Sequence, residues 1–324
     1  MNRRNSKGNC QMKISKGVFR SSDNYADIHY TVWSDGEKPK AIVQLVHGMA
    51  EYIGRYDDFA KFLVKNGYVV YGCDNIGHGS SINKEEDLGY IAGKDGYINI
   101  VNDLSCLTNI AKDEYPGIPF ILFGHSMGSL LARYYAGLYG DGLDGLILCG
   151  TSGSNPLASI GLLLIVVISA FKGRRFKSKF IDNMAFGQYN VRWKEKRTKF
   201  DWISLDSENV DRYIADRLCG YLFTVSAFGN LMRLLKAVTA KKWFMRIPDE
   251  LPVLLVSGCE DPVGNYGVGV TETEEKLKLA GLRDVSKILY EGLRHEILNE
   301  KERETVYSDI LSFTEKVLGN KKQA

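Results

Sequence analysis

The sequence predicts an α/β fold in which a mostly parallel central sheet carries helices on both faces and a helical cap is inserted late in the chain. Two observations lead to this prediction. Short apolar runs of strand length alternate with helical patterns, as in parallel sheets whose crossovers are helices. The alternation stops after residue 154 and resumes at residue 249. We therefore assign residues 1–154 and 249–324 to an α/β core and residues 155–248 to the cap, hereafter the cap segment.

The elements of the first part follow from apolar runs separated by Gly, Pro and polar turns. Residues 17–20 and 26–33 are expected to form two strands joined by a polar turn. The further strands predicted in this part are 41–46, 68–73, 118–123 and 143–149. The predicted helices are 57–66, which Gly67 ends, 97–114, which Pro116 closes, and one that begins at Met127.

The last part of the chain returns to the same alternation. Residues 252–257 and 286–290 are apolar enough to be strands, and residues 271–279 and 303–317 have helical patterns. These elements are expected to extend the sheet that the first part begins, so the cap segment interrupts one core.

The cap segment is mostly helical in pattern and rich in aromatic and basic residues. Residues 157–171 contain no charge, yet they fall short of the ~20 residues that a membrane span needs. Residues 172–199 hold ten Lys or Arg against two acids. An apolar stretch beside a basic stretch suits peripheral contact with an anionic membrane surface. A buried cap helix followed by a solvated basic loop explains the pattern equally well, and both interpretations stay open.

Composition limits the classes of partner and compartment. The net charge of +3 is too small to indicate nucleic-acid binding. None of the six cysteines forms a C-x-x-C pair, and Cys73, Cys149 and Cys259 lie in or just after apolar runs, where buried, reduced thiols are expected. The basic N-terminus has no apolar segment behind it, so no secretory signal is expected. These features predict a cytoplasmic protein; they predict no oligomeric state.

The strongest motif is Gly124-His125-Ser126-Met127-Gly128, which lies between a predicted strand and a predicted helix. This context is the one that a nucleophile elbow requires. A serine on such a sharp turn has strained backbone angles and an exposed hydroxyl, and glycines two residues to either side avoid a collision. We therefore predict that Ser126 is a catalytic nucleophile.

A serine hydroxyl needs a base that accepts its proton. His29 alternates with apolar residues on a strand, and His47, His78 and His125 adjoin glycines at strand ends; the side chain of His125 should point away from Ser126. His295 lies in a loop after the last predicted strand, which makes it the candidate base.

The acid that orients this base should follow the strand at 252–257, where Glu260 and Asp261 are both present. We favour Asp261 because Pro262 fixes the local turn. Attack on a carbonyl also requires donors for the oxyanion. The backbone N–H groups of Met127 and Met49 are the candidates, since they follow the nucleophile and the strand at 41–46.

Taken together, these motifs resemble the α/β-hydrolase superfamily and, within it, the monoacylglycerol lipase and lysophospholipase-like group. The matching pieces are His47-Gly48-Met49-Ala50-Glu51, Asp74-Asn75-Ile76-Gly77-His78-Gly79-Ser80-Ser81, Gly124-His125-Ser126-Met127-Gly128, Gly258-Cys259-Glu260-Asp261-Pro262-Val263 and Gly292-Leu293-Arg294-His295-Glu296. The resemblance implies an esterase that cleaves one acyl chain from a glycerol-based lipid without a cofactor or metal.

We therefore expect a serine ester hydrolase that acts on a small lipid ester, a monoacylglycerol or a lysophospholipid, through an acyl-enzyme. The alternatives on the same fold are a carboxylesterase for small esters, a proline-type serine peptidase and an acyltransferase. A catalytically silent binding module is the alternative from another class. The presence of Ser126, Asp261 and His295 argues against it.

Overall fold

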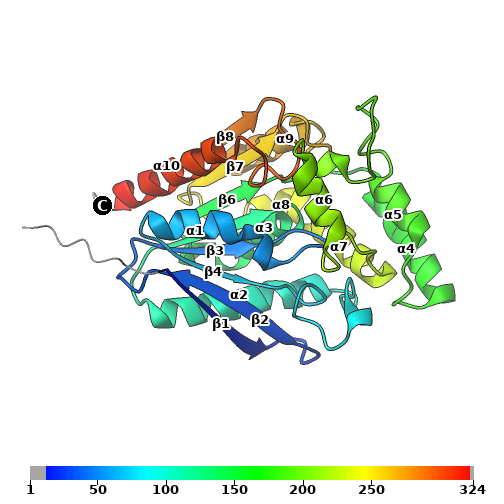
Figure 1. The fold of residues 1–324 in the computed structure, drawn as a ribbon, viewed down its shortest axis with the longest axis horizontal. Helices are drawn as coiled ribbons and strands as arrows, with labels where there is room; N and C mark the ends of the chain where they lie inside the picture. Colours follow the sequence, from blue (N-terminus) through cyan, green and yellow to red (C-terminus); the bar gives the residue numbers. More distant parts are fainter. Residues whose placement is uncertain (1–11, 322–324) are drawn as a thin grey trace, which may run out of the picture.

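The central feature of the computed structural model, which describes residues 12–321, is one eight-stranded sheet (Figure 1). The strand order is β1-β2-β4-β3-β5-β6-β7-β8; β1 and β2 run antiparallel to their neighbours, and the strands from β4 to β8 are mutually parallel. The strands are β1 (Lys13–Arg20), β2 (Asp27–Ser34), β3 (Ile42–Val46), β4 (Val69–Cys73), β5 (Phe120–His125), β6 (Gly145–Cys149), β7 (Val253–Gly258) and β8 (Val285–Tyr290). The predicted mostly parallel sheet is confirmed.

Helices cover both faces of this sheet. One apolar cluster joins the sheet to α1 (Asp57–Lys65) and α10 (Arg303–Lys321). A second cluster joins the opposite face to α2 (Gly96–Glu114), α3 (Met127–Tyr139) and α9 (Val268–Leu279). Central strands such as β5 and β6 are buried on both faces, which explains why they read as continuous apolar runs.

Successive side chains of a central strand join different apolar clusters. Ile121 and Phe123 of β5 pack with α1 and α10, whereas Phe120 and Leu122 pack with α2 and α3. This alternation is the two-residue period of a strand. A shift of one residue would exchange the two sets, so packing on both faces fixes the register.

The cap segment lies at the end of the molecule opposite the C-terminus (Figure 1). Its helices are α4 (Ala158–Lys172), α5 (Lys179–Phe186), α6 (Ser207–Ala215), α7 (Val225–Thr239) and α8 (Lys241–Phe244). The long helices α4 and α7 pack along each other, and α7 also packs on α3 of the core. The buried side chains of α7 join the larger apolar cluster, so the cap segment shares a core with the sheet.

Several predicted boundaries shift by a few residues. The first strand begins at Lys13, because pairing of Lys13 with Ser34 extends the antiparallel ladder beyond the apolar residues. Helix α9 begins at Val268, and β5 runs on to His125. Hydrogen bonds at element ends are invisible to an apolar pattern, which explains these differences.

One cysteine differs from the prediction. Cys73 and Cys149 are buried free thiols as expected, but Cys259 is only half-buried. It lies just past the end of β7, where its Sγ donates a hydrogen bond to Oε1 of Glu291 (3.4 Å). Cys10 and the first part of the basic N-terminus, residues 1–11, lie outside the described residues. Within residues 12–321, no helix has both the length and the apolarity that crossing a membrane demands.

Candidate active site

Ser126 lies on a sharp turn between β5 and α3. Its backbone has φ 54° and ψ −120°, a combination that is costly for any residue with a side chain. A methyl group on Gly124 would collide with the carbonyl oxygen of Gly128, and one on Gly128 would collide with that of Val46. Because both residues are glycine, β5 and α3 can pack closely enough to form the sharp turn that carries Ser126.

The structure brings Asp261 and His295 together. Nδ1 of His295 lies 2.8 Å from Oδ2 of Asp261, and both side chains are buried. Asp261 also accepts hydrogen bonds from the backbone N–H of Val263 (2.8 Å) and the hydroxyl of Ser257 (3.2 Å), which fix its orientation. Because Nδ1 donates to the carboxylate, Nε2 is the nitrogen left to accept a proton.

Glu260, the other candidate acid, lies elsewhere. Its carboxylate is paired with Arg192 at 3.4 Å, and both side chains are exposed to solvent. Asp261 therefore points into the interior toward His295, whereas Glu260 points to solvent.

The two candidate oxyanion donors, Met49 and Met127, line the same cavity as Ser126 and His295. Among the described residues, neither backbone N–H has a hydrogen-bond acceptor. The loop that carries Met49 passes directly beside Ser126: a methyl group on Gly48 would lie 3.1 Å from Cβ of Ser126. Two unengaged N–H groups near one serine are what a developing oxyanion needs.

The loop after β3 is held from two sides. On the core side, Glu51 accepts hydrogen bonds from the N–H of Gly48 (2.5 Å) and the hydroxyl of Tyr56 (2.8 Å). On the other side, the carbonyl of Ala50 accepts from the N–H of Gly220 (2.9 Å) and the hydroxyl of Tyr213 (3.1 Å). Gly220 and Tyr213 belong to the cap segment, which thus holds the loop on the side opposite Glu51 and Tyr56.

The loop that carries His295 is also fixed by the cap segment, which the sequence did not predict. Arg294 donates to the carbonyl oxygens of Asp201 (2.5 Å) and Ser204 (3.2 Å). The N–H of Glu296 donates to the carbonyl of Ile203 (2.7 Å). Tertiary packing alone places residues 201–204 there, and no local sequence pattern indicates it.

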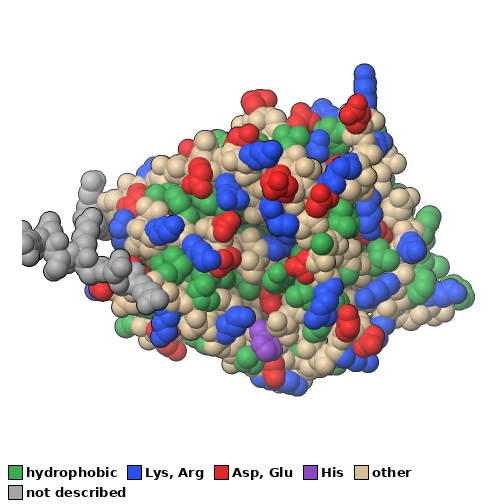
Figure 2. All heavy atoms as spheres, viewed as in Figure 1, with side chains coloured by type: hydrophobic (Ala, Val, Ile, Leu, Met, Phe, Trp, Pro, Cys, Tyr) green, Lys and Arg blue, Asp and Glu red, His purple; other side chains and the backbone are tan. Residues whose placement is uncertain are grey.

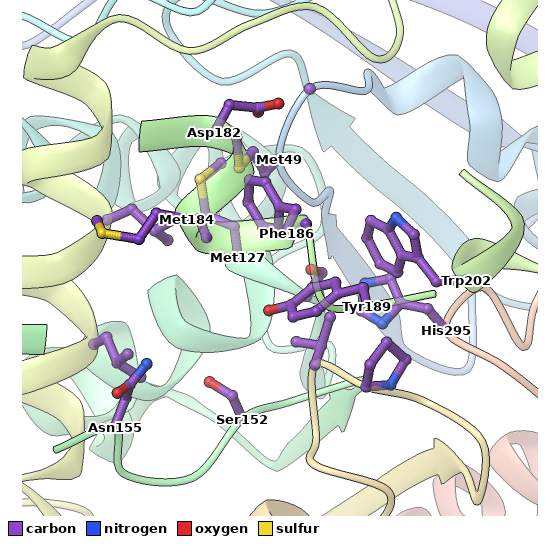
Figure 3. A pocket seen from close by; sticks show the side chains of 18 of the residues that line it. Met49, Met127, Ser152, Asn155, Asp182, Met184, Phe186, Tyr189, Trp202 and His295 are labelled. Atoms are coloured by element: carbon purple, nitrogen blue, oxygen red, sulfur yellow. The ribbon is translucent and has the colours of Figure 1, made fainter. Parts of the chain in front are cut away.

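Aromatic side chains of the cap segment pack against the candidate base. The ring of Trp202 lies 5.2 Å from that of His295, and Tyr189 packs edge-on against Trp202 at 5.0 Å. Figure 3 shows Trp202 and Tyr189 beside His295, with Phe186 nearby. The side chain of His295, packed against these rings, is buried.

The other histidines have structural surroundings. His29 is exposed on β2, and Nε2 of His47 accepts the N–H of Asn75 (2.9 Å). Burial, together with His47, lowers the pKa of His78 to about 3. His125 directs its ring nitrogens toward Glu51 and the carbonyl of His295. Among the described residues, no cluster of His, Cys, Asp and Glu could hold a metal ion.

A cavity of about 830 Å³ opens at Ser126 and His295. Its walls come from the cap segment and from the core, and most of them are apolar. Side chains of α4 and α7, among them Ile165, Phe228, Leu231 and Leu235, form one apolar wall. The volume lies within the range of small-molecule sites, ≈ 300–1,000 Å³.

Comparisons with known proteins agree with this geometry. The family model described as serine aminopeptidase, S33, matches residues 37–302. The monoacylglycerol lipase of Mycolicibacterium smegmatis is 27% identical over 294 residues, covering 88% of this chain and 92% of that protein. The phospholipase YtpA of Bacillus subtilis is 26% identical over 87% of this chain and 98% of its own. The crystal structure of a thermostable carboxyl esterase from Bacillus coagulans has 30% identity and a TM-score of 0.89, covering 95% and 100% of the two chains.

Proposed function

Because the chain belongs to the serine aminopeptidase S33 family of α/β-hydrolases and is an ester hydrolase, we propose that it cleaves the acyl ester of a single-chain lipid. The proposed substrate is a monoacylglycerol or a lysophospholipid. The observation that carries the proposal is the apolar cavity beside Ser126, which has room for one acyl chain. The relatives named as monoacylglycerol lipase and phospholipase support the same substrate class.

The reaction would proceed through an acyl-enzyme. Oγ of Ser126 attacks the ester carbonyl while Nε2 of His295 takes its proton, and the N–H groups of Met49 and Met127 stabilise the oxyanion. His295 then gives the proton to the departing alcohol. In the second half, His295 takes a proton from water as the water oxygen attacks the acyl-enzyme, and His295 returns that proton to Oγ of Ser126 as the fatty acid leaves. Asp261 holds the tautomer of His295 and stabilises its charged form.

A substrate panel tests the proposal. We expect kcat/KM for monoacylglycerols or lysophospholipids with long chains to exceed that for a two-carbon ester. A preference for the two-carbon ester would instead favour a small-ester carboxylesterase, and turnover of aminoacyl amides would favour the peptidase. Acyl transfer to an added alcohol in preference to water would identify an acyltransferase.

Leu231→Trp is the variant that tests the cavity. Leu231 lies on α7 and lines the cavity, so the larger ring would occupy the space proposed for the acyl chain. We expect kcat/KM for a long-chain monoacylglycerol to fall about tenfold or more, while a two-carbon ester is little affected. Leu205→Trp is the matched control, because Leu205 is 52% exposed and does not line the cavity. Equal losses for both substrates would contradict the assignment.

We also propose that the cap segment contacts a membrane surface. Leu157, just before α4, and the outer side chains of α4 are largely exposed; on α4 these are Ile160, Leu163, Val166 and Phe171. Figure 2 shows apolar side chains beside Lys and Arg at the edge where Figure 1 places α4 and α5. Leu157 and Ile160 line the cavity as well, so the apolar surface continues into the proposed acyl site. A lipid surface would cover this face and supply the substrate.

Only some of the neighbouring basic residues remain available to anionic lipid. Arg175 is paired with Asp87 (2.6 Å) and stacks over the ring of Tyr90 (3.7 Å), and Lys177 is half-buried. Lys172, Arg174 and Lys179 are exposed. Among the five basic residues from 172 to 179, these three therefore carry the electrostatic part of the proposed contact.

Replacing Lys172, Arg174 and Lys179 with Gln is expected to weaken binding to vesicles that contain anionic lipid. Each basic residue near such a surface contributes about 1 kcal/mol, and the loss should shrink at high salt. Sedimentation of vesicles at two salt concentrations measures it. Replacing Lys13, Lys16 and Lys65, which lie on β1 and α1 away from α4, makes the same charge change as a control. Equal vesicle binding by both variants would contradict the proposed contact and indicate that the three basic residues only face solvent.

A further inference from the structure

His125 directly precedes Ser126, and its ring is buried between two loops. Nδ1 lies 3.3 Å from Oε1 of Glu51, and Nε2 lies 3.3 Å from the backbone oxygen of His295. A carbonyl oxygen and an ionised carboxylate only accept hydrogen bonds. A neutral imidazole has one N–H, so it would leave one of these oxygens facing a lone pair.

The other contacts of Glu51 are those that favour an ionised carboxylate. Its carboxylate accepts the N–H of Gly48 (2.5 Å) and the hydroxyl of Tyr56 (2.8 Å), and it lies 3.4 Å from Nε of Arg55. Burial alone would raise the pKa of Glu51, but His125 and Arg55 hold it well below its ordinary value. Glu51 therefore offers only acceptors to the ring of His125.

The charges of this cluster balance only if His125 is positive. Arg55 is paired with two buried carboxylates, Glu51 and Glu296; its Nη2 lies 2.5 Å from Oε2 of Glu296. One guanidinium leaves one negative charge uncompensated, which is costly in a buried site. Burial opposes a charge on His125, but the hydrogen bond with Glu51 and the charges of Glu51 and Glu296 raise the pKa of His125 above its ordinary value.

We propose that His125 is a positioning residue that acts as a buried imidazolium, with one N–H tied to the loop of Met49 and the other to the loop of His295. The Nδ1–H group holds Glu51, which in turn anchors Gly48 beside the oxyanion donor. The Nε2–H group holds the backbone of His295 in its place beside Asp261. One ring behind the nucleophile thus aligns both of its partners. This inference rests on the proposed function of Ser126 and His295.

The proposal has a pH dependence whose sign follows from the surroundings. The groups that face His125, directly or through Glu51, are His47, Glu51, Arg55 and Tyr56 after β3, Cys149 on β6, and His295 and Glu296 after β8. Because the pKa of His125 is raised, the doubly protonated ring is fully present below the ordinary pKa of histidine and is lost as pH rises through the folded value. Alignment, and with it kcat/KM, should decline on the alkaline side.

Nitrogen-15 NMR of the full chain, labelled at histidine, reads the protonation state directly. We expect two N–H signals from His125 at neutral pH, identified by their absence in His125→Asn. His78 is the internal control: Nδ1 lies 3.1 Å from the carbonyl of Ile76, and with its pKa lowered to about 3 it should carry a single proton. A singly protonated His125 at neutral pH would overturn the proposal.

Glu51→Gln tests the functional consequence. The amide keeps an acceptor for the N–H of Gly48 but removes the charge that holds the second proton on His125. The alkaline limb of the pH profile, where kcat/KM for a soluble ester declines, should therefore move about 1–3 pH units lower. We expect kcat/KM at its optimum to fall about tenfold or more. Glu114→Gln is the matched control, since Glu114 also accepts a tyrosine hydroxyl, that of Tyr71 (2.5 Å), far from the site.

An alkaline limb that stays at the parent's pH in Glu51→Gln would contradict the positioning role. If that variant does not fold, the NMR spectrum of the parent still decides the protonation state. An imidazolium signal in a protein without esterase activity would refute the proposed function and leave the assignment of the ring intact.

Discussion

Ser126→Ala is expected to abolish hydrolysis, with kcat lower by a factor on the order of 10⁶ if Ser126 acts as proposed, because no covalent intermediate can form. The strained turn presents this hydroxyl at the cavity that also contains His295 and the N–H groups of Met49 and Met127. A fluorophosphonate probe should label the parent and leave the variant unlabelled. The measurement therefore identifies the nucleophile even if the preferred substrate is still unknown.

Ser152→Ala is the control for this experiment. Ser152 lines the same cavity but lies outside the strained turn, so its loss should leave labelling intact. Labelling that survives Ser126→Ala would refute the nucleophile and revive the binding-module interpretation.

Asp261→Asn is expected to lower kcat by about 10⁴, the loss measured when the acid of a serine protease triad is changed in the same way. The carboxylate accepts the Nδ1–H of His295 at 2.8 Å, whereas an amide can turn its NH₂ toward that nitrogen and select the wrong tautomer. Initial rates with a soluble ester measure the effect.

Glu260→Gln provides the comparison at the neighbouring position. Its carboxylate forms an exposed pair with Arg192, a type of interaction that contributes little to stability, so most activity should remain. If Glu260→Gln were the more damaging change, the role would pass to Glu260.

The sequence predicted the parts of the site that depend on local patterns. Ser126, Asp261 and His295 each follow a predicted strand, and the carboxyl ends of parallel strands meet at one edge of the sheet, so their proximity could be expected. The strand-turn-helix pattern at Ser126 is local in the same sense. By contrast, the pairing of β1 with β2 continues beyond the apolar residues of β1 and has no local pattern. The sequence therefore did not predict that β1 begins at Lys13.

The interactions that no pattern indicated join segments far apart in the chain. Trp202 packs against His295 although about ninety residues separate them in the sequence. Arg55 is hydrogen-bonded to Glu296, which is 241 residues away in the sequence. Arg175 was grouped with the other basic residues because sequence carries no sign of its pairing with Asp87. Such contacts arise only once distant segments of the chain pack together, some within the core and others between the core and the cap segment.

The contacts between residues 201–204 and the loop of His295 restrict how far the cap segment can be treated as an interchangeable module. Arg294 and Glu296 donate hydrogen bonds to the backbone carbonyls of Asp201, Ile203 and Ser204, so this stretch supports the loop of His295 from outside the core. A chimaera that replaced residues 155–248 to alter substrate preference would remove that support. Exchanges limited to α4 and α5 leave it in place, so new acyl-chain selectivity should be engineered, and by the same logic should have diversified, through those two helices.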